Sequence, residues 1–87
     1  MDIVTVYANT MMKAAVVYCQ QRGIPIQADH LSQCLKAHKE TIHGALNDAK
    51  GALDCGMDQV AETTFKASAA QAGISAAKMY DDERNHV

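Results

Sequence analysis

Histidine and cysteine recur along one predicted helix at a spacing that suits metal binding. His30, Cys34 and His38 are each four residues apart, and His43 follows. Residues four apart share one helix face, and imidazole and thiolate groups are common zinc ligands. Each such step rises about 6 Å, so one ion could take two of the first three side chains. It would then need ligands from another helix or chain.

The same spacing also arises without any ligand, because a helix places every fourth residue on one face. A small buried Cys34 between solvated histidines would give this pattern. Cys34 with His30 or His38 could in principle form a thiolate–imidazole pair, but no third orienting group is evident. The chain also lacks CxxC, HExxH, a P-loop, GxGxxG and GxSxG. We therefore predict a protein that is not an enzyme and has no cofactor and no bound metal, and leave open whether His30, Cys34 and His38 bind one.

The elements that position these residues belong to one small domain, residues 1–87. Much of the 48% hydrophobic content is alanine, so large apolar side chains are few. Small scaffolds with thin cores usually need disulfides, a metal or a partner chain. The composition therefore favours a homo-oligomer, a dimer or a tetramer, over a self-sufficient monomer.

Charge and cysteine content indicate where the protein works and what it does not bind. Eight basic and ten acidic residues give a net charge of −2, so no overall basic field attracts nucleic acid. The three cysteines have no paired spacing, and no basic segment precedes the apolar stretch 3–19. Asn9, Thr10 and Lys13 interrupt that stretch, which makes it too polar for a membrane span. We expect a cytoplasmic protein with free thiols and no membrane association.

Residues 1–22 carry two adjacent apolar stripes at helical spacing. One stripe comprises Val4, Tyr7, Met11, Ala14 and Tyr18, and the other comprises Ala8, Met12, Ala15 and Cys19. Two stripes cover more of a helix than packing against one neighbour requires. We therefore predict that this helix also forms an oligomer or partner interface, through Val4, Tyr7, Met11, Met12, Ala15, Tyr18 and Cys19.

Glycine and proline predict where the helices end. Gly23 and Pro25 end the first helix, and a second helix is expected over 29–53. A break at Cys55–Asp58 precedes a third helix over 58–72. Gly73 interrupts that helix before a last short one. The predicted fold class is all-α, a small bundle of three to four helices completed by oligomerisation.

The segment 69–80 resembles the helix-turn-helix of DNA-binding regulators. In this reading small and turn-forming residues allow a close crossing and a left-handed turn, Ser75 opens the second helix, and apolar residues lock the two helices together. The matching positions are Ala69, Gly73, Ile74, Ser75, Lys78 and Met79.

The chemistry of this segment departs from that family. Recognition helices offer Arg, Lys, Asn or Gln to bases and phosphates. Here Lys78 stands alone among alanines, and the carboxylates of 81–83 would repel phosphate. We favour a corner that does not touch DNA, with a small DNA-binding transcriptional regulator as the alternative function.

As a whole, the chain is similar to the small helical antagonists of temperate bacteriophages, in particular antirepressors. The resemblance lies in size, helical make-up, acidity and the helix-turn-helix-like corner without basic residues. It implies a non-enzymatic protein-interaction module that binds and inactivates a regulatory protein such as a transcriptional repressor. An anti-restriction or anti-CRISPR inhibitor would share these features, so the partner stays open.

Overall fold

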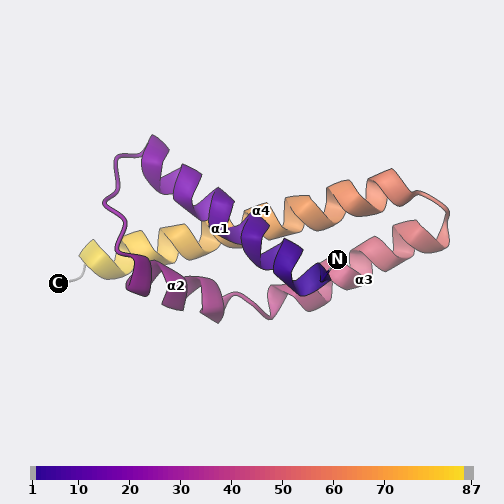
Figure 1. The fold of residues 1–87 in the computed structure, drawn as a ribbon, viewed down its shortest axis with the longest axis horizontal. Coiled ribbons are helices and arrows are strands. Elements are labelled where there is room, and N and C mark those ends of the chain that lie inside the picture. Colours follow the sequence, from indigo (N-terminus) through magenta and orange to yellow (C-terminus); the bar gives the residue numbers. More distant parts are fainter. Residues whose placement is uncertain (1, 86–87) are drawn as a thin grey trace.

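The longest helix, α4 (Asp58–Asn85), is the surface on which the other three helices pack (Figure 1). The computed structural model describes residues 2–85, and this range contains four helices and no strand. The others are α1 (Ile3–Gln21), α2 (Ala28–Ala37) and α3 (Thr41–Asp54). Together they form an elongated bundle of 48 × 22 × 21 Å. The predicted all-α class is confirmed. No helix in the described range is long and apolar enough to cross a membrane.

Two glycines end helices where the sequence predicts it. Gly23 and Gly56 have φ values of 67° and 74°, which a side chain would strain. After each one, a backbone N–H bonds the carbonyl five residues earlier, at 2.9 Å in both cases, which satisfies a helix-end acceptor. These turns separate α1 from α2 and α3 from α4.

The predicted helix over 29–53 is wrong, because the chain breaks at 38–40 into α2 and α3. Neither Gly nor Pro marks this break; side chains hold it instead. His38 Nδ1 donates to the Cys34 carbonyl at 3.0 Å, and Thr41 Oγ1 donates to the His38 carbonyl at 2.7 Å. Since the Thr41 proton is used there, the Tyr7 hydroxyl donates to Thr41 Oγ1 at 2.6 Å. The break is therefore tied to α1.

The predicted turn at Gly73 is also wrong, because α4 runs through it without interruption. Gly73 is buried and does not have a positive φ. A Cβ at this position would lie 2.2 Å from the Met11 carbonyl oxygen and 3.1 Å from the Ala14 Cβ. Glycine is needed here for the close approach of α1 to α4, and not for a turn.

The core has two parts, one in each half of the bundle, and α1 contributes to both. In the first, Tyr7 meets Phe65 edge to face, with ring centroids 5.3 Å apart. The first part comprises Tyr7, Met11, Ile42, Ala45, Ala49, Ala61, Phe65, Ala69 and Ala72. The second part comprises Ala15, Cys19, Leu31, Cys34, Ala76, Ala77 and Tyr80. Alanines of α4 let the other helices approach closely, so a thin supply of large side chains still gives a packed interior.

Candidate functional site

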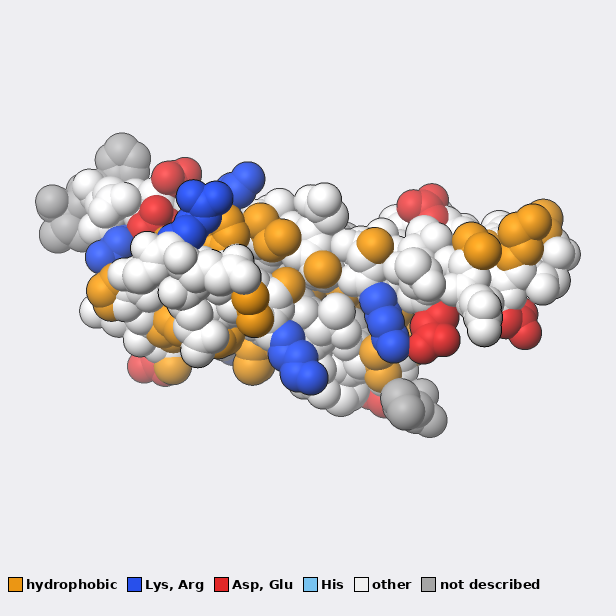
Figure 2. Space-filling model, turned by 90° about the horizontal axis from the view of Figure 1, so that it is seen from above, with side chains coloured by type: hydrophobic (Ala, Val, Ile, Leu, Met, Phe, Trp, Pro, Cys, Tyr) orange, Lys and Arg blue, Asp and Glu red, His pale blue; other side chains and the backbone are white. Residues whose placement is uncertain are grey.

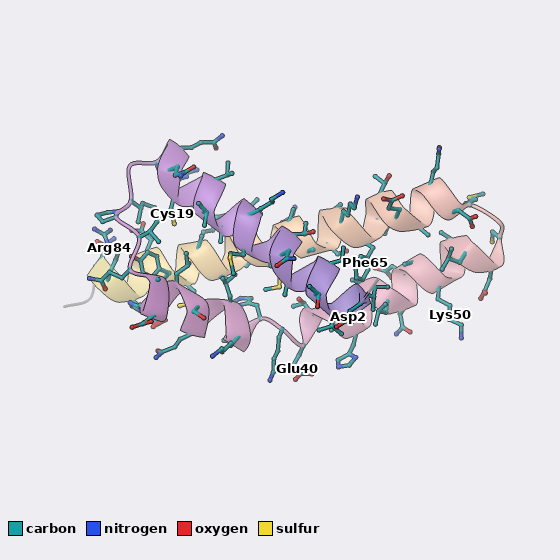
Figure 3. All side chains as sticks on the ribbon, in the orientation of Figure 1. Asp2, Cys19, Glu40, Lys50, Phe65 and Arg84 are labelled. Carbon is teal, nitrogen blue, oxygen red and sulfur yellow. The ribbon has the colours of Figure 1, made fainter. Side chains whose placement is uncertain are left out.

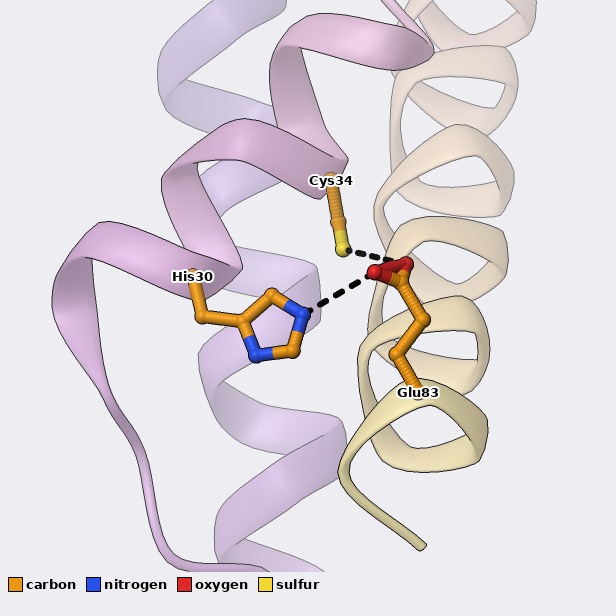
Figure 4. Close-up of side chains that lie close together, drawn as sticks. All are labelled: His30, Cys34 and Glu83. Atoms are coloured by element: carbon orange, nitrogen blue, oxygen red, sulfur yellow. Dashed lines mark hydrogen bonds and ion pairs between the residues drawn. The ribbon is translucent and has the colours of Figure 1, made fainter. Parts of the chain in front are cut away.

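His30, Cys34 and Glu83 meet between α2 and the last turns of α4 (Figure 4). His30 Nε2 lies 3.0 Å from Glu83 Oε1, and Cys34 Sγ donates to Glu83 Oε2 at 3.5 Å. One nitrogen, one sulfur and one oxygen of these side chains all lie within 4.8 Å of one another. This is the one group of three or more such side chains within residues 2–85 that the structure brings to metal-binding range.

The α1–α2 loop positions this cluster through Tyr80, which is buried on α4 one turn before Glu83. The Tyr80 hydroxyl donates to the Pro25 carbonyl and accepts from the Gln27 N–H at 2.9 Å. Its ring stands edge-on to His30, with centroids 5.0 Å apart. The start of α2 is thereby fixed against the end of α4. Cys19 and Arg84 lie at this same end of the molecule, and Lys50 lies toward the other (Figure 3).

The electrostatics of the cluster favour a thiol and a carboxylate. Burial, and after it the hydrogen bond and negative charge of Glu83, raise the pKa of Cys34 to about 11. The hydrogen bond from His30 holds the pKa of Glu83 below its usual value. At neutral pH, therefore, Cys34 is protonated and Glu83 is charged.

Solvent reaches one side of the cluster. The side chains of His30 and Glu83 are 28% and 47% exposed, whereas Cys34 is buried. A cleft beside them is also lined by Pro25, Gln27, Tyr80 and Arg84. The Arg84 guanidinium forms an ion pair with Asp81, with Nη1 and Oδ1 2.8 Å apart, so the Asp81 carboxylate partly neutralises its charge.

The structure brings together only part of the series His30, Cys34, His38 and His43. His30 and Cys34 share the site, but His38 turns back to bond the Cys34 carbonyl, and His43 pairs with Glu40 at 3.3 Å on an exposed surface. The break at 38–40 separates His43 from the face of α2. The expectation that further ligands would come from another helix fits Glu83, one of the carboxylates of 81–83. Its spacing of three residues from Tyr80 was the available signal.

The residues predicted for an interface are divided between core and surface. Tyr7, Met11, Ala15 and Cys19 are buried inside the chain. Val4 and Met12 are exposed by 58% and 52%, and Tyr18 is half-buried beneath the Arg22 guanidinium, 4.6 Å from its ring. The buried line of α1 thus takes members from both predicted stripes.

The exposed residues of α1 flank an apolar groove between α1 and α2–α3. Val4 and Met12 form one wall, Leu35 and Ile42 are apolar residues of the other side, and lysines stand at its edge. The groove is lined by Val4, Tyr7, Ala8, Met11, Met12, Ser32, Leu35, Lys36, Lys39 and Ile42.

A second exposed apolar patch lies at the α3–α4 turn. Leu53, Met57 and Val60 are each about half exposed there. Figure 2 shows hydrophobic side chains at one end of the molecule and others along the middle and toward the opposite end, with the basic side chains away from the first end.

The residues of the helix-turn-helix-like segment lie on several faces of one continuous helix. Ala69 and Gly73 are buried, and Ile74 is half-buried. Ser75, Lys78 and Met79 are exposed. The structure therefore presents no separate second helix in this segment.

Comparisons of the chain with protein-family models, with curated proteins and with solved structures give no match.

Proposed function

We propose that this chain is a non-enzymatic protein-interaction module whose groove between α1 and α2–α3 binds a regulatory protein, such as a transcriptional repressor. The observation that supports it is the row Val4, Ala8 and Met12, which is exposed along α1 while the opposite side of that helix packs on α4. Large apolar side chains beside a concave apolar surface are typical of binding sites. The class of partner follows the antirepressor resemblance.

The shape and charge of the groove indicate what it binds. A row at i, i+4 and i+8 facing a second helix can hold one amphipathic helix of a partner. Lys36 and Lys39 line the groove, so acidic residues beside the apolar stripe of that helix would be favoured. The three cysteines are free, which supports the reducing cytoplasm as the place where this happens.

A small DNA-binding transcriptional regulator is the alternative function, and we favour it less. A recognition helix must project from a bihelical corner, and α4 runs uninterrupted through the segment 69–80. The exposed Lys78 is followed by three acidic residues on the same helix.

The test compares two double variants that carry the same added charge. Val4→Glu/Met12→Glu alters the groove, and Leu53→Glu/Met57→Glu alters the equally exposed patch at the α3–α4 turn. Each protein is used to capture partners from native host cells, and the captured repressor is then tested for release from its operator. Wild type and the Leu53/Met57 variant should capture the repressor and release it from its operator. The groove variant should do neither. Unchanged capture by the groove variant, or direct retardation of DNA that weakens steeply with salt, would contradict the proposal.

A further inference from the structure

We propose that His30, Cys34 and Glu83 form a binding site for one zinc ion, which bridges α2 and α4. This site lies outside the proposed partner groove. His30 and Cys34 lie on α2, and Glu83 lies on α4 about fifty residues later in the sequence. The fold alone brings their ligand atoms within 4.8 Å of one another.

The geometry is close to that of a tetrahedral zinc site. With usual zinc–ligand bond lengths, two ligand atoms at a tetrahedral angle are about 3.4–3.6 Å apart. His30 Nε2 and Cys34 Sγ now lie 3.0 Å and 3.5 Å from the two oxygens of Glu83. Adjustments of roughly 1 Å within flexible side chains therefore suffice to place all three at bonding distance.

The donor set selects zinc over the hard cations. One imidazole, one thiol sulfur and one carboxylate suit zinc, whereas magnesium and calcium prefer oxygen ligands throughout. Binding of the ion would displace the Cys34 proton to solvent. The resulting thiolate and the Glu83 carboxylate would then cancel the two positive charges of the ion.

The surroundings leave a fourth position for water. The cleft beside His30 and Glu83 opens to solvent, while Cys34 closes the inner side. Three protein ligands and one exchangeable position describe an open site. Tyr80, which packs on His30 and holds the loop before α2, keeps the imidazole in place.

Cobalt(II) provides the direct test, because it occupies zinc sites and reports on its ligands by absorption. The full chain without a histidine tag is titrated with cobalt and then with zinc. We expect one equivalent to bind, with a sulfur-to-cobalt charge-transfer band and the intense visible bands of tetrahedral cobalt, and zinc should displace both. Zinc at about 100 times its dissociation constant should raise Tm by roughly 10–20 °C.

Matched variants assign the ligands. Cys34→Ser should abolish the charge-transfer band, and Cys55→Ser, at an exposed thiol in the α3–α4 turn, should keep it. Glu83→Gln and His30→Gln should each weaken binding by more than the roughly 10–100-fold that loss of a supporting residue costs, and His43→Gln should not. Glu83 is exposed, so Glu83→Gln should fold normally. This variant therefore tests the zinc site even if Cys34→Ser does not fold. Absence of a stoichiometric ion, or a band that survives in Cys34→Ser or Glu83→Gln with unchanged affinity, would overturn the proposal.

Discussion

Replacement of Gly73 by alanine tests the closest contact in the bundle. The new Cβ would lie 2.2 Å from the Met11 carbonyl oxygen, and even a separation of 3.0 Å would require a shift of about 0.8 Å. The obstacle is backbone, so no side-chain rotation relieves it, and α1 must move away from α4. A gap of about 0.5–1 Å between the two helices removes a quarter to a half of the van der Waals attraction between the atoms that face it. Overpacking of this kind costs about 1–3 kcal/mol.

Gly44→Ala is the matched control. Gly44 also lies within a helix, but a Cβ there would meet nothing within 4 Å. Both substitutions gain about 1 kcal/mol of helix propensity, so their difference isolates the steric cost at Gly73. For a difference of about 2 kcal/mol, Gly73→Ala should melt roughly 8–16 °C below Gly44→Ala.

Thermal and urea unfolding, followed by far-ultraviolet circular dichroism at one protein concentration, measure this difference. Equal urea m-values would show that both variants unfold from equally compact states. If Gly73→Ala proved as stable as Gly44→Ala, α1 and α4 could not approach as closely as the structure shows.

Three further substitutions or measurements separate core from surface. Met11→Lys should unfold the chain, because Met11 is 3% exposed, whereas Met12→Lys should leave the circular dichroism spectrum intact. If α1 holds a homo-oligomer, sedimentation velocity should show smaller particles for Met12→Lys than for wild type. A compact wild-type monomer at high micromolar concentration would refute that assembly. At pH 8 iodoacetamide should modify exposed Cys55 much faster than Cys34, whose pKa is raised to about 11. Mass spectrometry of the peptides gives both modification rates. Equal rates would show that Cys34 is not shielded. Tyr80→Phe should cost about 1–3 kcal/mol of unfolding free energy, because the α1–α2 loop loses two hydrogen bonds to this hydroxyl, each worth about 0.5–1.5 kcal/mol. An unchanged melting temperature would show that this loop is held by other contacts.

The sequence predicts the fold class and two of the helix ends, because Gly23 and Gly56 occupy positions where only backbone conformation matters. It misleads at Gly73, because the same residue type serves either a positive φ or the absence of a side chain at a helix crossing. Only the position of α1 distinguishes the two. The break at 38–40 carries no local signal in the sequence, because hydrogen bonds from His38 and Thr41 hold it and Thr41 is in turn bonded to Tyr7 of α1.

The candidate site was predictable only in part. The spacing of His30 and Cys34 follows from helix geometry and can be counted along the chain. Glu83 joins them because the buried Tyr80 sets the rotation of α4. That rotation depends on packing between distant segments, which a local pattern does not record.

The position of α4 as the common packing surface has a consequence for synthesis. α1, α2 and α3 leave the ribosome before the helix that covers them exists, and none of them packs extensively on another. At about 5–20 residues per second, translation of the 28 residues of α4 takes roughly 1–6 s. During that interval Tyr7, Met11 and Cys19 remain uncovered, whereas helix formation itself takes only microseconds. The nascent chain is thus exposed to chaperones and proteases until α4 emerges.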